Sequence, residues 1–262
     1  MSFIVDAEST HNRKVAEGCY NLTFRAPEIT GSAQPGQFVH LRCGPTLDPL
    51  LRRPLGIQGV KREQELVQVL YQIVGKGTRL LTAFEPGGRV NVLGPLGRGF
   101  TLPAGARRAA LIAGGLGIAP LCFLYEELAE QGIAVEVFHG VRSAGQVSAH
   151  DLIPDGRVLM ASDDGSLGYH GSVVKMFEDH IGLETFDFFF ATGPSPMLRA
   201  LGKLAEQHNL PGQVSLEERM GCGIGACLCC NCRTKDKDED GWRYSRVCAD
   251  GPVFPVEEVV WP

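Results

Sequence analysis

The stretch from Cys222 to Cys248 constrains this chain more than any other, because it holds six of the nine cysteines. A C-x4-C-x2-C pattern is followed, after residues 231–247, by one further cysteine, and the four positions are Cys222, Cys227, Cys230 and Cys248. This spacing is typical of a [2Fe-2S] site with four thiolate ligands. Backbone N–H groups must turn inward to the sulfurs at such a site, and small residues allow this at Gly221, Gly223, Gly225 and Ala226. The sequence therefore predicts a cluster bound by these four cysteines.

Two other uses of the cysteines are a structural zinc site and a disulfide framework. A structural zinc ion also takes four thiolates, usually from two C-x2-C pairs. Here Cys227 with Cys230, or Cys229 with Cys232, would supply one such pair. A disulfide framework belongs to an oxidising compartment, which nothing in the sequence indicates. Cys229 and Cys232 are able to replace a ligand, but we predict that they do not bind metal because the other four complete the spacing.

The whole chain has the composition of a globular protein. It has 262 residues, of which 44% are hydrophobic, and a formal net charge of −5. This length allows two domains and a small appendage. Because the charge is mild and no basic stripe is present, we expect no nucleic-acid partner.

Nothing in the sequence predicts a membrane protein. Residues 1–10 have neither the positive region nor the apolar region of a signal peptide. The longest apolar run, at residues 109–124, is interrupted by glycines and Pro120 and is too short to span a bilayer. We therefore expect a cytoplasmic protein with no membrane segment.

The first part of the chain, residues 1–103, has the pattern of a small antiparallel barrel. Runs of strand-forming residues alternate with turn signals such as the Pro-Gly pairs at 35–36 and 86–87. Six strands are expected, at residues 3–7, 19–25, 37–42, 54–60, 66–73 and 89–93. One helix is expected at residues 77–84, because its apolar residues fall on one face. Six short strands of this kind predict a closed barrel.

Two clusters in this part have the chemistry of an anion site. Arg53 lies just before a predicted strand, where its guanidinium can hold a phosphate through two parallel hydrogen bonds. Gly75, Gly77 and Thr78 open the predicted helix, where glycines leave backbone N–H groups free to bind an anion such as a pyrophosphate. Each cluster alone is also compatible with an exposed arginine or an ordinary helix start.

Residues 104–216 change to alternating strands and helices. A near-continuous apolar run at 108–113 indicates a strand buried on both faces. Further strands are expected at 134–141, 157–161, 186–191 and 213–217, with helices ending near residue 130 and covering 171–180 and 196–208. This alternation predicts a doubly wound parallel sheet, and ligands of such sheets bind beyond the carboxyl ends of the strands.

Two small-residue turns follow strands of this sheet. The first contains Gly114, Gly115, Gly117 and Pro120, and it lacks the full G-x-G-x-x-G pattern of common dehydrogenases. The second contains Gly193, Pro194 and Met197. Small residues let a dinucleotide pyrophosphate approach a helix N-terminus. These turns therefore predict a nucleotide site, although a tight turn between strand and helix is the structural alternative.

The last segment, residues 217–262, is expected to form a small lobe around the cysteines. Between Cys230 and Cys248 it contains a highly charged insert, residues 234–242. Such a composition predicts an exposed loop that leaves the ligands undisturbed. The complete fold class is then mixed β and α/β, with a barrel, a parallel-sheet domain and a C-terminal cluster lobe.

The order of these parts resembles a known family. The arginine cluster followed by Gly75-x-Gly77-Thr78 resembles the FAD-binding barrel of the ferredoxin reductase superfamily. The whole chain resembles the electron-transfer subunits of type B dihydroorotate dehydrogenase. The matching stretches are Asp48 to Leu55, Tyr71 to Thr78, Gly94 to Gly97, Gly114 to Pro120, Gly193 to Leu198, Glu217 to Cys227 and Cys248 to Phe254. Two departures are Gly56, where the family has serine, and Thr192, where it often has cysteine.

The resemblance implies cofactors and the residues that hold them. FAD contacts are implied at Arg53, Pro54, Leu55, Gly56, Leu70, Tyr71, Gln72, Gly75, Gly77 and Thr78. NAD contacts are implied at Gly114, Gly115, Gly117, Pro120, Gly193, Pro194 and Met197. The [2Fe-2S] ligands are implied at the four cysteines already predicted, and no residue of this chain is implied to act as a catalytic acid or base.

The resemblance also implies a function and a partner. Electrons would pass between NAD, FAD and the [2Fe-2S] cluster and then to an FMN-containing dihydroorotate dehydrogenase subunit, in a heterotetramer of two of each chain that serves pyrimidine biosynthesis. The dihydroorotate chemistry would belong to the partner. A flavin must stand between hydride and cluster, because it handles both two-electron and one-electron steps.

Three alternatives remain at this point. The chain is compatible with a related subunit of a hydrogenase, transhydrogenase or sulfite reductase, which would share the cofactors and differ in partner. It is compatible with a self-sufficient reductase that serves a small diffusible carrier. A third alternative, of another class, is a zinc-stabilised nucleotide-binding regulator without redox activity.

Overall fold

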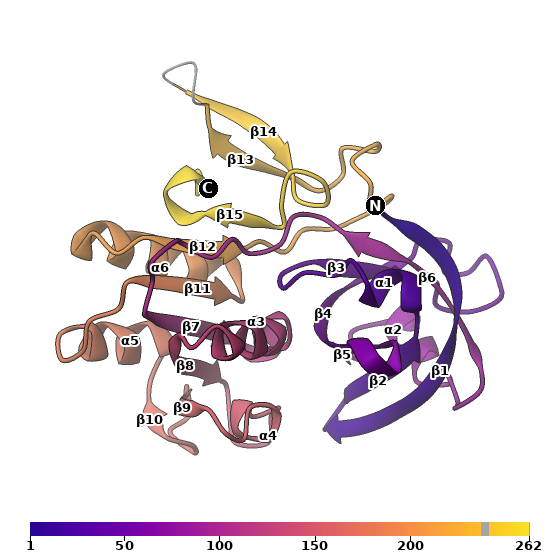
Figure 1. Ribbon diagram of the computed structural model, residues 1–262, viewed down its shortest axis with the longest axis horizontal. Helices are drawn as coiled ribbons and strands as arrows, with labels where there is room; N and C mark the ends of the chain where they lie inside the picture. Colours follow the sequence, from indigo (N-terminus) through magenta and orange to yellow (C-terminus); the bar gives the residue numbers. More distant parts are fainter. Residues whose placement is uncertain (237–240, 262) are drawn as a thin grey trace.

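The computed structural model describes residues 1–236 and 241–261 of the chain. Figure 1 shows three parts, which are a barrel, a sheet flanked by helices, and a C-terminal lobe with a hairpin that stands above the junction of the first two. The predicted fold class is confirmed.

The barrel is closed by six antiparallel strands in the order β1-β2-β5-β4-β3-β6. The strands are β1 (Phe3–Ala16), β2 (Cys19–Arg25), β3 (Phe38–Leu41), β4 (Arg53–Lys61), β5 (Leu66–Gln72) and β6 (Arg89–Leu96). Short helices lie between them at α1 (Pro27–Thr30), η1 (Arg62–Gln64) and α2 (Lys76–Leu81). Strand β1 is longer than predicted because it continues past residue 7 to pair with β2 along its second half.

The interior of the barrel follows the period of two that strands impose. On β3, Val39 and Leu41 point inward and pack with apolar residues of the other strands. The other face of β3 carries Phe38 and His40, which are also buried. Phe38 belongs to a different apolar cluster, one that contains Cys230 and Cys248 of the C-terminal lobe. The outer face of β3 is therefore covered by the cysteine segment.

The second part is a seven-stranded sheet in the order β10-β9-β8-β7-β11-β12-β15. Its strands are β7 (Arg108–Gly114), β8 (Ala134–Val141), β9 (Arg157–Ser162), β10 (Tyr169–His170), β11 (Phe188–Thr192), β12 (Gly212–Ser215) and β15 (Val253–Pro255). All neighbours are parallel except β12 and β15, which are antiparallel. The helices are η2 (Gly115–Gly117), α3 (Ile118–Glu130), α4 (Ala149–Leu152), α5 (Val173–Ile181) and α6 (Ser195–His208).

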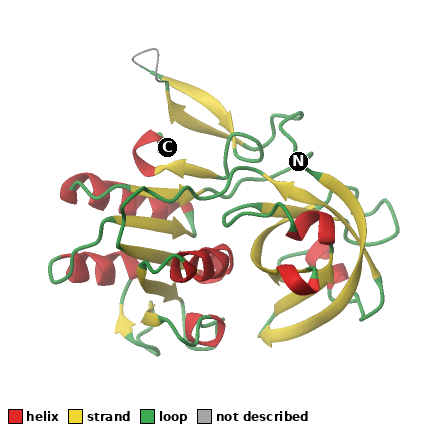
Figure 2. Ribbon diagram, viewed as in Figure 1, coloured by secondary structure: helices red, strands yellow, loops and turns green. Residues whose placement is uncertain are grey.

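Both faces of this sheet are covered by helices, as Figure 2 shows. On β7, Ala109 and Leu111 pack with α3, whereas Ala110 and Ile112 pack with α5 and α6. Helix α5 begins at Val173, slightly later than predicted, because the Ser172 hydroxyl accepts a hydrogen bond from the N–H of Lys175 and caps the helix.

Helix α3 also joins the sheet to the barrel. Its Phe123 side chain packs into the apolar cluster of the barrel, and Pro120 lies 3.6 Å from the position that a Cβ on Gly56 would take. Ion pairs at the surface, Lys61 with Glu126 and Arg62 with Glu127, border this contact. The carboxyl ends of the sheet strands therefore lie next to the strand that carries the arginine cluster.

The C-terminal segment divides into a cysteine loop, a hairpin and a return to the sheet. The hairpin consists of β13 (Asn231–Lys235) and β14 (Trp242–Arg246), and η3 (Val256–Glu258) follows β15. The ends of the charged insert predicted as a loop at 234–242 are thus strands, because Thr234 and Lys235 pair with Arg243 and Trp242. Residues 237–240 of that insert lie outside the described residues.

Strand β15 was not predicted and belongs to the sheet, although it lies within the range expected for the lobe. A main-chain hydrogen bond ties this segment to the exit of the barrel, where the N–H of Arg98 donates to the Gly251 carbonyl at 2.5 Å. Beside it, Gly97 has φ of +76°, and an added Cβ would lie 2.5 Å from Pro252. The C-terminal segment is therefore fixed to both the barrel and the sheet.

Within the described residues, no helix has the length and apolar character needed to cross a membrane.

We predict that Gly97→Ala destabilises the protein by loosening the contact between barrel exit and C-terminal segment. The variant combines left-handed strain with a clash, so its free energy of unfolding should fall by about 2–4 kcal/mol, as measured by urea denaturation. Gly87→Ala is the matched control, since Gly87 has φ of +82° but no atom within 4 Å of an added Cβ. It should lose only about 1 kcal/mol. Equal losses in the two variants would contradict this account of the junction.

Candidate functional site

Main-chain N–H groups of the cysteine loop point at cysteine sulfurs. The N–H groups of Ile224, Ala226 and Cys227 lie 3.5, 3.3 and 3.4 Å from the Sγ of Cys222. The N–H of Gly225 donates to the Sγ of Cys248 at 3.1 Å. The loop can turn this tightly because Gly223 and Gly225 have φ of +74° and +81°. Several N–H donors directed at the same sulfurs stabilise negative charge on them, as in thiolates.

The four predicted ligands form two pairs. The N–H of Cys222 donates to the Sγ of Cys227 at 3.4 Å, and the N–H of Cys227 lies 3.4 Å from the Sγ of Cys222. The N–H of Cys248 donates to the Sγ of Cys230 at 3.4 Å. Two thiol pairs suit a two-iron cluster, in which each iron takes two protein thiolates. A single zinc ion would hold all four sulfurs at similar distances from one centre.

The two pairs differ in their surroundings. Cys230 and Cys248 are both 2% exposed, whereas Cys227 is exposed and Cys222 is half-buried. Burial acts to raise the pKa of Cys222, but the N–H groups of Ile224, Cys227 and Ala226 outweigh it and lower the pKa to about 6. Burial and the neighbouring Cys230 raise the pKa of Cys248 to about 12. A bound metal ion would deprotonate such a thiol by its own charge.

Cys229 and Cys232 are placed differently from these four. Cys229 is exposed. Cys232 lies on β13, and its thiol donates to the Ser245 carbonyl of β14 at 3.5 Å. It lines a cavity of about 290 Å³ between the hairpin and the sheet, together with Glu217 and Trp261.

A paired arginine and aspartate close the cysteine loop, and the sequence analysis missed this pair. Arg246 donates through Nε and Nη2 to the two carboxylate oxygens of Asp250, at 2.9 and 3.0 Å. Its Nη1 also donates to the Gly225 carbonyl at 3.3 Å. The fork geometry fixes the main chain on both sides of Cys248. An arginine four residues before an aspartate was the only sequence signal for it.

The predicted FAD residues of the barrel form a cradle around Arg53. A Cβ added to Gly77 would lie 2.6 Å from the Nε of Arg53, so the glycine leaves room for the guanidinium at the start of α2. The Nη1 of Arg53 donates to the Leu51 carbonyl at 2.7 Å. The neighbouring Arg52 has a different task, since its guanidinium is bonded to the His40 carbonyl and to Asn91.

Thr78 supports this cradle from within. Its hydroxyl accepts hydrogen bonds from the N–H groups of Val74 and Gly75, at 2.9 and 3.3 Å, and the side chain is buried. An ion pair between Lys76 and Asp48 connects the turn to the loop before β4. Thr78 therefore shapes the turn, and the main chain around Gly75 and Gly77 is the part available to an anion.

The other predicted FAD residues lie at three different places. Pro54, Leu55 and Gly56 lie half-buried on β4, beside Arg53. Leu70 is buried against α3, and Gln72 is exposed at the edge of a cavity that borders the parallel sheet. The Tyr71 side chain is 1% exposed inside the barrel, where its hydroxyl donates to the Oδ1 of Asn12 at 3.1 Å. The structure thus keeps the Tyr71 ring away from any ligand on the barrel surface.

The two small-residue turns of the sheet pack against each other. A Cβ on Gly114 would lie 2.7 Å from Pro194 and 2.8 Å from the sulfur of Met197. A Cβ on Gly117 would lie 2.3 Å from the Thr192 carbonyl oxygen, and one on Gly193 would lie 2.6 Å from Met197. The glycines at these positions are required by close approach of the two turns as well as by any ligand.

A cavity of about 850 Å³ opens at these turns, at the carboxyl ends of the strands. Six of the seven predicted NAD residues line it, namely Gly114, Gly115, Gly117, Gly193, Pro194 and Met197. The seventh, Pro120, lies against Gly56 of the barrel instead. Arg142 and Lys175 also line the cavity, together with the carboxylates of Asp163, Glu178 and Glu217, so its lining carries charges of both signs. The buried Thr192 hydroxyl has no hydrogen-bond partner among the described residues, so a polar ligand group near it would satisfy it.

Glu217 is a further residue of this region whose side chain the sequence analysis did not single out. It lines both the nucleotide cavity and the smaller cavity beside Cys232. Its carboxylate is open to the cavities yet surrounded by protein atoms, and this desolvation raises its pKa.

His40 is the second residue that the sequence analysis missed. Its side chain is 0% exposed, and neither ring nitrogen has a hydrogen-bond partner of good geometry among the described residues. Burial, followed by the charge of Arg52, lowers the pKa of His40 to about 4, although the nearby main chain of Cys222 acts in the opposite direction. A polar residue in the apolar run Phe38–Leu41 was the available signal.

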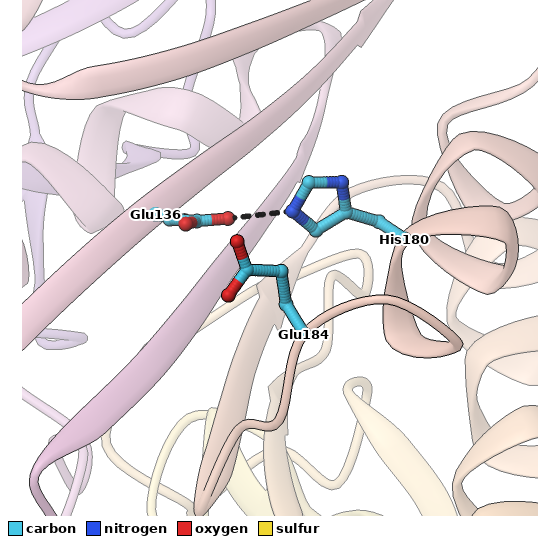
Figure 3. A group of neighbouring side chains, drawn as sticks. All are labelled: Glu136, His180 and Glu184. Atoms are coloured by element: carbon cyan, nitrogen blue, oxygen red, sulfur yellow. Dashed lines mark hydrogen bonds and ion pairs between the residues drawn. The ribbon is translucent and has the colours of Figure 1, made fainter.

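A separate acidic group at the other end of the sheet has a structural explanation. Figure 3 shows Glu136, His180 and Glu184 close together, with His180 Nε2 2.9 Å from the Glu136 carboxylate. Two arginines neutralise the carboxylates, since Arg108 and Arg157 lie 2.6 and 2.5 Å from Glu136 and Arg108 lies 2.5 Å from Glu184. The group therefore ties together the starts of β7, β8 and β9 without needing a metal ion.

Comparisons with known proteins agree with this architecture. A family model described as the iron-sulfur cluster binding domain of dihydroorotate dehydrogenase B matches residues 217–260. Dihydroorotate dehydrogenase B (NAD(+)), electron transfer subunit, of Desulforamulus reducens is 43% identical over 263 residues, and the match covers 100% of both chains. The protein of the same name from Geobacillus thermodenitrificans is 43% identical over 252 residues, with 95% of both chains covered.

Solved structures share the fold. The structure of an NADH-dependent reduced ferredoxin-NADP oxidoreductase, described in work on flavin-based electron bifurcation, superposes with a TM-score of 0.83 at 29% identity. That match covers 100% of this chain and 92% of the other. A ferredoxin reductase of carbazole 1,9a-dioxygenase superposes with a TM-score of 0.68 at 19% identity, covering 80% of this chain and 67% of the other, and so shows the fold alone.

Barrel, parallel sheet and cysteine loop together define a ferredoxin reductase-like oxidoreductase subunit with an added iron–sulfur domain. With identity of 43% over its full length, the chain belongs to the family of dihydroorotate dehydrogenase B (NAD(+)) electron transfer subunits. The resemblance found in the sequence is confirmed.

We predict that Cys230→Ser abolishes the cluster and that Cys232→Ser leaves it intact. Both cysteines lie at the start of the hairpin, but only Cys230 is paired with Cys248. Anaerobically purified protein should contain roughly two irons per chain, and the same should hold for Cys232→Ser and Cys229→Ser. Iron, acid-labile sulfide and the visible spectrum are the measurements. A cluster that survives Cys230→Ser but not Cys229→Ser would refute the ligand set.

A second prediction concerns the barrel cradle. Arg53→Ala should weaken FAD binding roughly 30-fold, because charge-assisted hydrogen bonds worth about 2 kcal/mol are lost. The FAD affinity of Arg53→Lys should lie between those of Arg53→Ala and the unaltered protein, since lysine keeps the positive charge but cannot form two parallel hydrogen bonds. Arg52→Ala should lower stability while changing the FAD dissociation constant less than about threefold, because both Nη groups of Arg52 are bonded to the protein, whereas among the described residues only Nη1 of Arg53 is. Flavin fluorescence during dilution measures all three, and equal FAD affinity in Arg53→Ala and the unaltered protein would rule out this role.

Proposed function

We propose that this chain passes electrons between NAD and the catalytic subunit of a dihydroorotate dehydrogenase, through FAD and a [2Fe-2S] cluster. The observation that carries the proposal is the position of the cysteine loop. It lies on the outer face of β3, next to the strand that bears Arg53, while the nucleotide cavity opens beside Gln72 of the same barrel. One chain therefore supports three neighbouring sites in the order that such electron transfer requires.

The FAD site in this proposal is the cradle at the start of β4 and α2. Arg53 would hold the pyrophosphate by its guanidinium, and the main chain at Gly75 and Gly77 would donate N–H groups to the same oxygens. Pro54, Leu55 and Gly56 would form the wall beside the flavin ring. The fit is supported by Gly77, whose missing Cβ leaves the room that Arg53 occupies. Leu70 and Tyr71 would contribute through the backbone of β5, because their side chains are buried.

The NAD site in this proposal is the cavity at the carboxyl ends of the sheet. Gly114, Gly115 and Gly117 would let the pyrophosphate approach the turn before α3. Gly193, Pro194 and Met197 would border the nicotinamide, and the unpartnered Thr192 hydroxyl supports a polar group near that place. Pro120 would separate the NAD site from the flavin site, since it lies against Gly56.

The cluster site comprises Cys222, Cys227, Cys230 and Cys248, with N–H groups of the loop directed at the sulfurs. Bound FAD supplies the step from two-electron hydride chemistry to one-electron transfer. The protein's own task is to hold these groups in place, to keep water from the buried Cys230–Cys248 pair, and to set potentials through hydrogen bonds and burial. No side chain needs to act as a general acid or base in this scheme.

The partner in this proposal is an FMN-containing catalytic subunit, in a complex of two chains of each kind. Large apolar side chains exposed on the cluster lobe support a protein partner there, and they are Ile224, Leu228, Trp242 and Tyr244. Dihydroorotate would react on that partner, as part of pyrimidine biosynthesis. The nine cysteines, free of disulfides, suit a reducing cytoplasm.

The proposed division of the chain is 1–103 for FAD, 104–216 for NAD and 217–262 for the cluster. One refinement follows from the sheet, because β15 of the last range pairs with β12. The cluster lobe proper would then end near Gly251, and the final residues would serve to fix it to the NAD domain.

A second candidate function is a subunit of an electron-bifurcating reductase that uses the same cofactors. The TM-score of 0.83 with the NADH-dependent reduced ferredoxin-NADP oxidoreductase favours it. The identity with that chain is 29%, against 43% with the dihydroorotate dehydrogenase subunits, so we place it second. Identification of the subunit that co-purifies with the chain separates the two functions.

We predict that the isolated chain oxidises NADH with ferricyanide but does not oxidise dihydroorotate. Adding the FMN-bearing subunit should produce NAD⁺-linked dihydroorotate oxidation. Cys230→Ser should abolish this coupled reaction while leaving at least about half of the NADH–ferricyanide activity, since FAD alone can reduce that acceptor. Dihydroorotate turnover by the isolated chain would overturn the division of labour. Coupled turnover that persists without the cluster would overturn the electron path.

A further inference from the structure

A buried histidine lies between the two proposed redox sites. Strand β3 is entirely buried, and its outward residues Phe38 and His40 face the cysteine loop. On the other side, β3 pairs with β4, and the register sets His40 opposite Pro54 and Leu41 opposite Arg53. His40 is therefore one strand away from the FAD cradle and directly beneath the cluster loop.

The contact with the loop is close and specific. A Cβ added to Gly223 would lie 2.6 Å from the Nδ1 of His40 and 3.2 Å from its Cε1. Gly223 thus leaves room for the imidazole ring, next to the ligand Cys222. The main chain of Cys222 lies near the ring as well. Position 223 requires glycine for two reasons: a Cβ would collide with the His40 ring, and φ is +74°.

A histidine at this place has an energetic cost that packing alone does not offset. A buried polar atom without a hydrogen bond costs about 1–3 kcal/mol, and both ring nitrogens lack a well-formed one among the described residues. Its inward neighbours Val39 and Leu41 are aliphatic, and its outward neighbour Phe38 is aromatic. An apolar side chain would fill the same space, so the imidazole points to a hydrogen-bond partner in the adjacent cysteine loop.

We propose that His40 is a positioning residue that, with the cluster in place, donates a hydrogen bond from Nδ1 to the main chain at Cys222 and so raises the cluster's reduction potential; this rests on the proposed function. The bond holds the turn whose N–H groups, from Ile224, Ala226 and Cys227, point at the Cys222 sulfur. Those donors stabilise the reduced cluster more than the oxidised one, because reduction adds negative charge at the sulfurs. A residue of β3, the strand beside the flavin cradle, thereby helps to set the reduction potential of the cluster.

The test is a redox titration of the full-length chain with its cofactors, in which electron paramagnetic resonance monitors the reduced cluster and gives its midpoint potential. His40→Leu removes the donor and keeps an apolar side chain, so it should lower the potential by at least a tenfold change in the one-electron equilibrium, about 59 mV. His40→Asn places an amide N–H near the position of Nδ1 and should restore the potential to within threefold of the unaltered protein.

Phe38→Leu is the matched control, because Phe38 lies on the same face of β3 and packs against the lobe without a donor. It should leave the potential within threefold of the unaltered value. An unshifted potential in His40→Leu, or a shift in Phe38→Leu as large as that in His40→Leu, would overturn the proposal. If His40→Leu loses its cluster, His40→Asn decides: a wild-type potential supports the proposal, whereas a tenfold shift or a lost cluster overturns it. Absence of any cluster signal in the unaltered chain would instead contradict the proposed function.

Discussion

The hydrogen bond from the Arg98 N–H to the Gly251 carbonyl is the interaction on which the arrangement of this molecule depends. It joins the exit of the barrel to the segment that follows the last cysteine. Immediately afterwards the chain enters β15 and pairs with β12 of the sheet. The cysteine loop is thus tied at its end to both larger parts, and one apolar cluster with residues from the barrel, the sheet and the lobe packs beneath it. A loop tethered at one point would not keep a fixed distance to the flavin cradle.

The three proposed cofactor sites share a physical solution. Each would use main-chain N–H groups of a glycine-rich turn, at Gly75 to Gly77, at Gly114 to Gly117 and at Gly221 to Gly225. FAD, NAD and an iron–sulfur cluster all carry negative charge close to the protein, and backbone donors can approach it without a long side chain. Side chains act mainly as supports, as Thr78 does for the first turn and Arg246 with Asp250 for the third. This explains why no catalytic acid or base was found in the sequence or is needed in the proposed mechanism.

Much of the fold could be predicted from local patterns. The strand-forming residues at 66–73 and the apolar run at 108–113 predict strands, because β-propensity and burial on both faces can be read from local sequence. The cysteine spacing predicted four ligands but not how they pair. Strand β15 was missed because three residues carry no periodicity, and its pairing with β12 is a long-range event. His40 was missed because its contact is with Gly223, a residue distant in the sequence. Whether an inward or an outward face meets a ligand depends on register, which a single sequence does not specify.

The central claim is that one chain links NAD, flavin and cluster in series. The most direct measurement is anaerobic mixing of the isolated full-length chain with NADH, with flavin absorbance followed by stopped flow and the cluster by freeze-quenched electron paramagnetic resonance. The account predicts that flavin bleaching comes first and that the reduced-cluster signal then grows as electrons leave the flavin. A cluster that stays oxidised beside fully reduced flavin, or one that is reduced before the flavin, would contradict it.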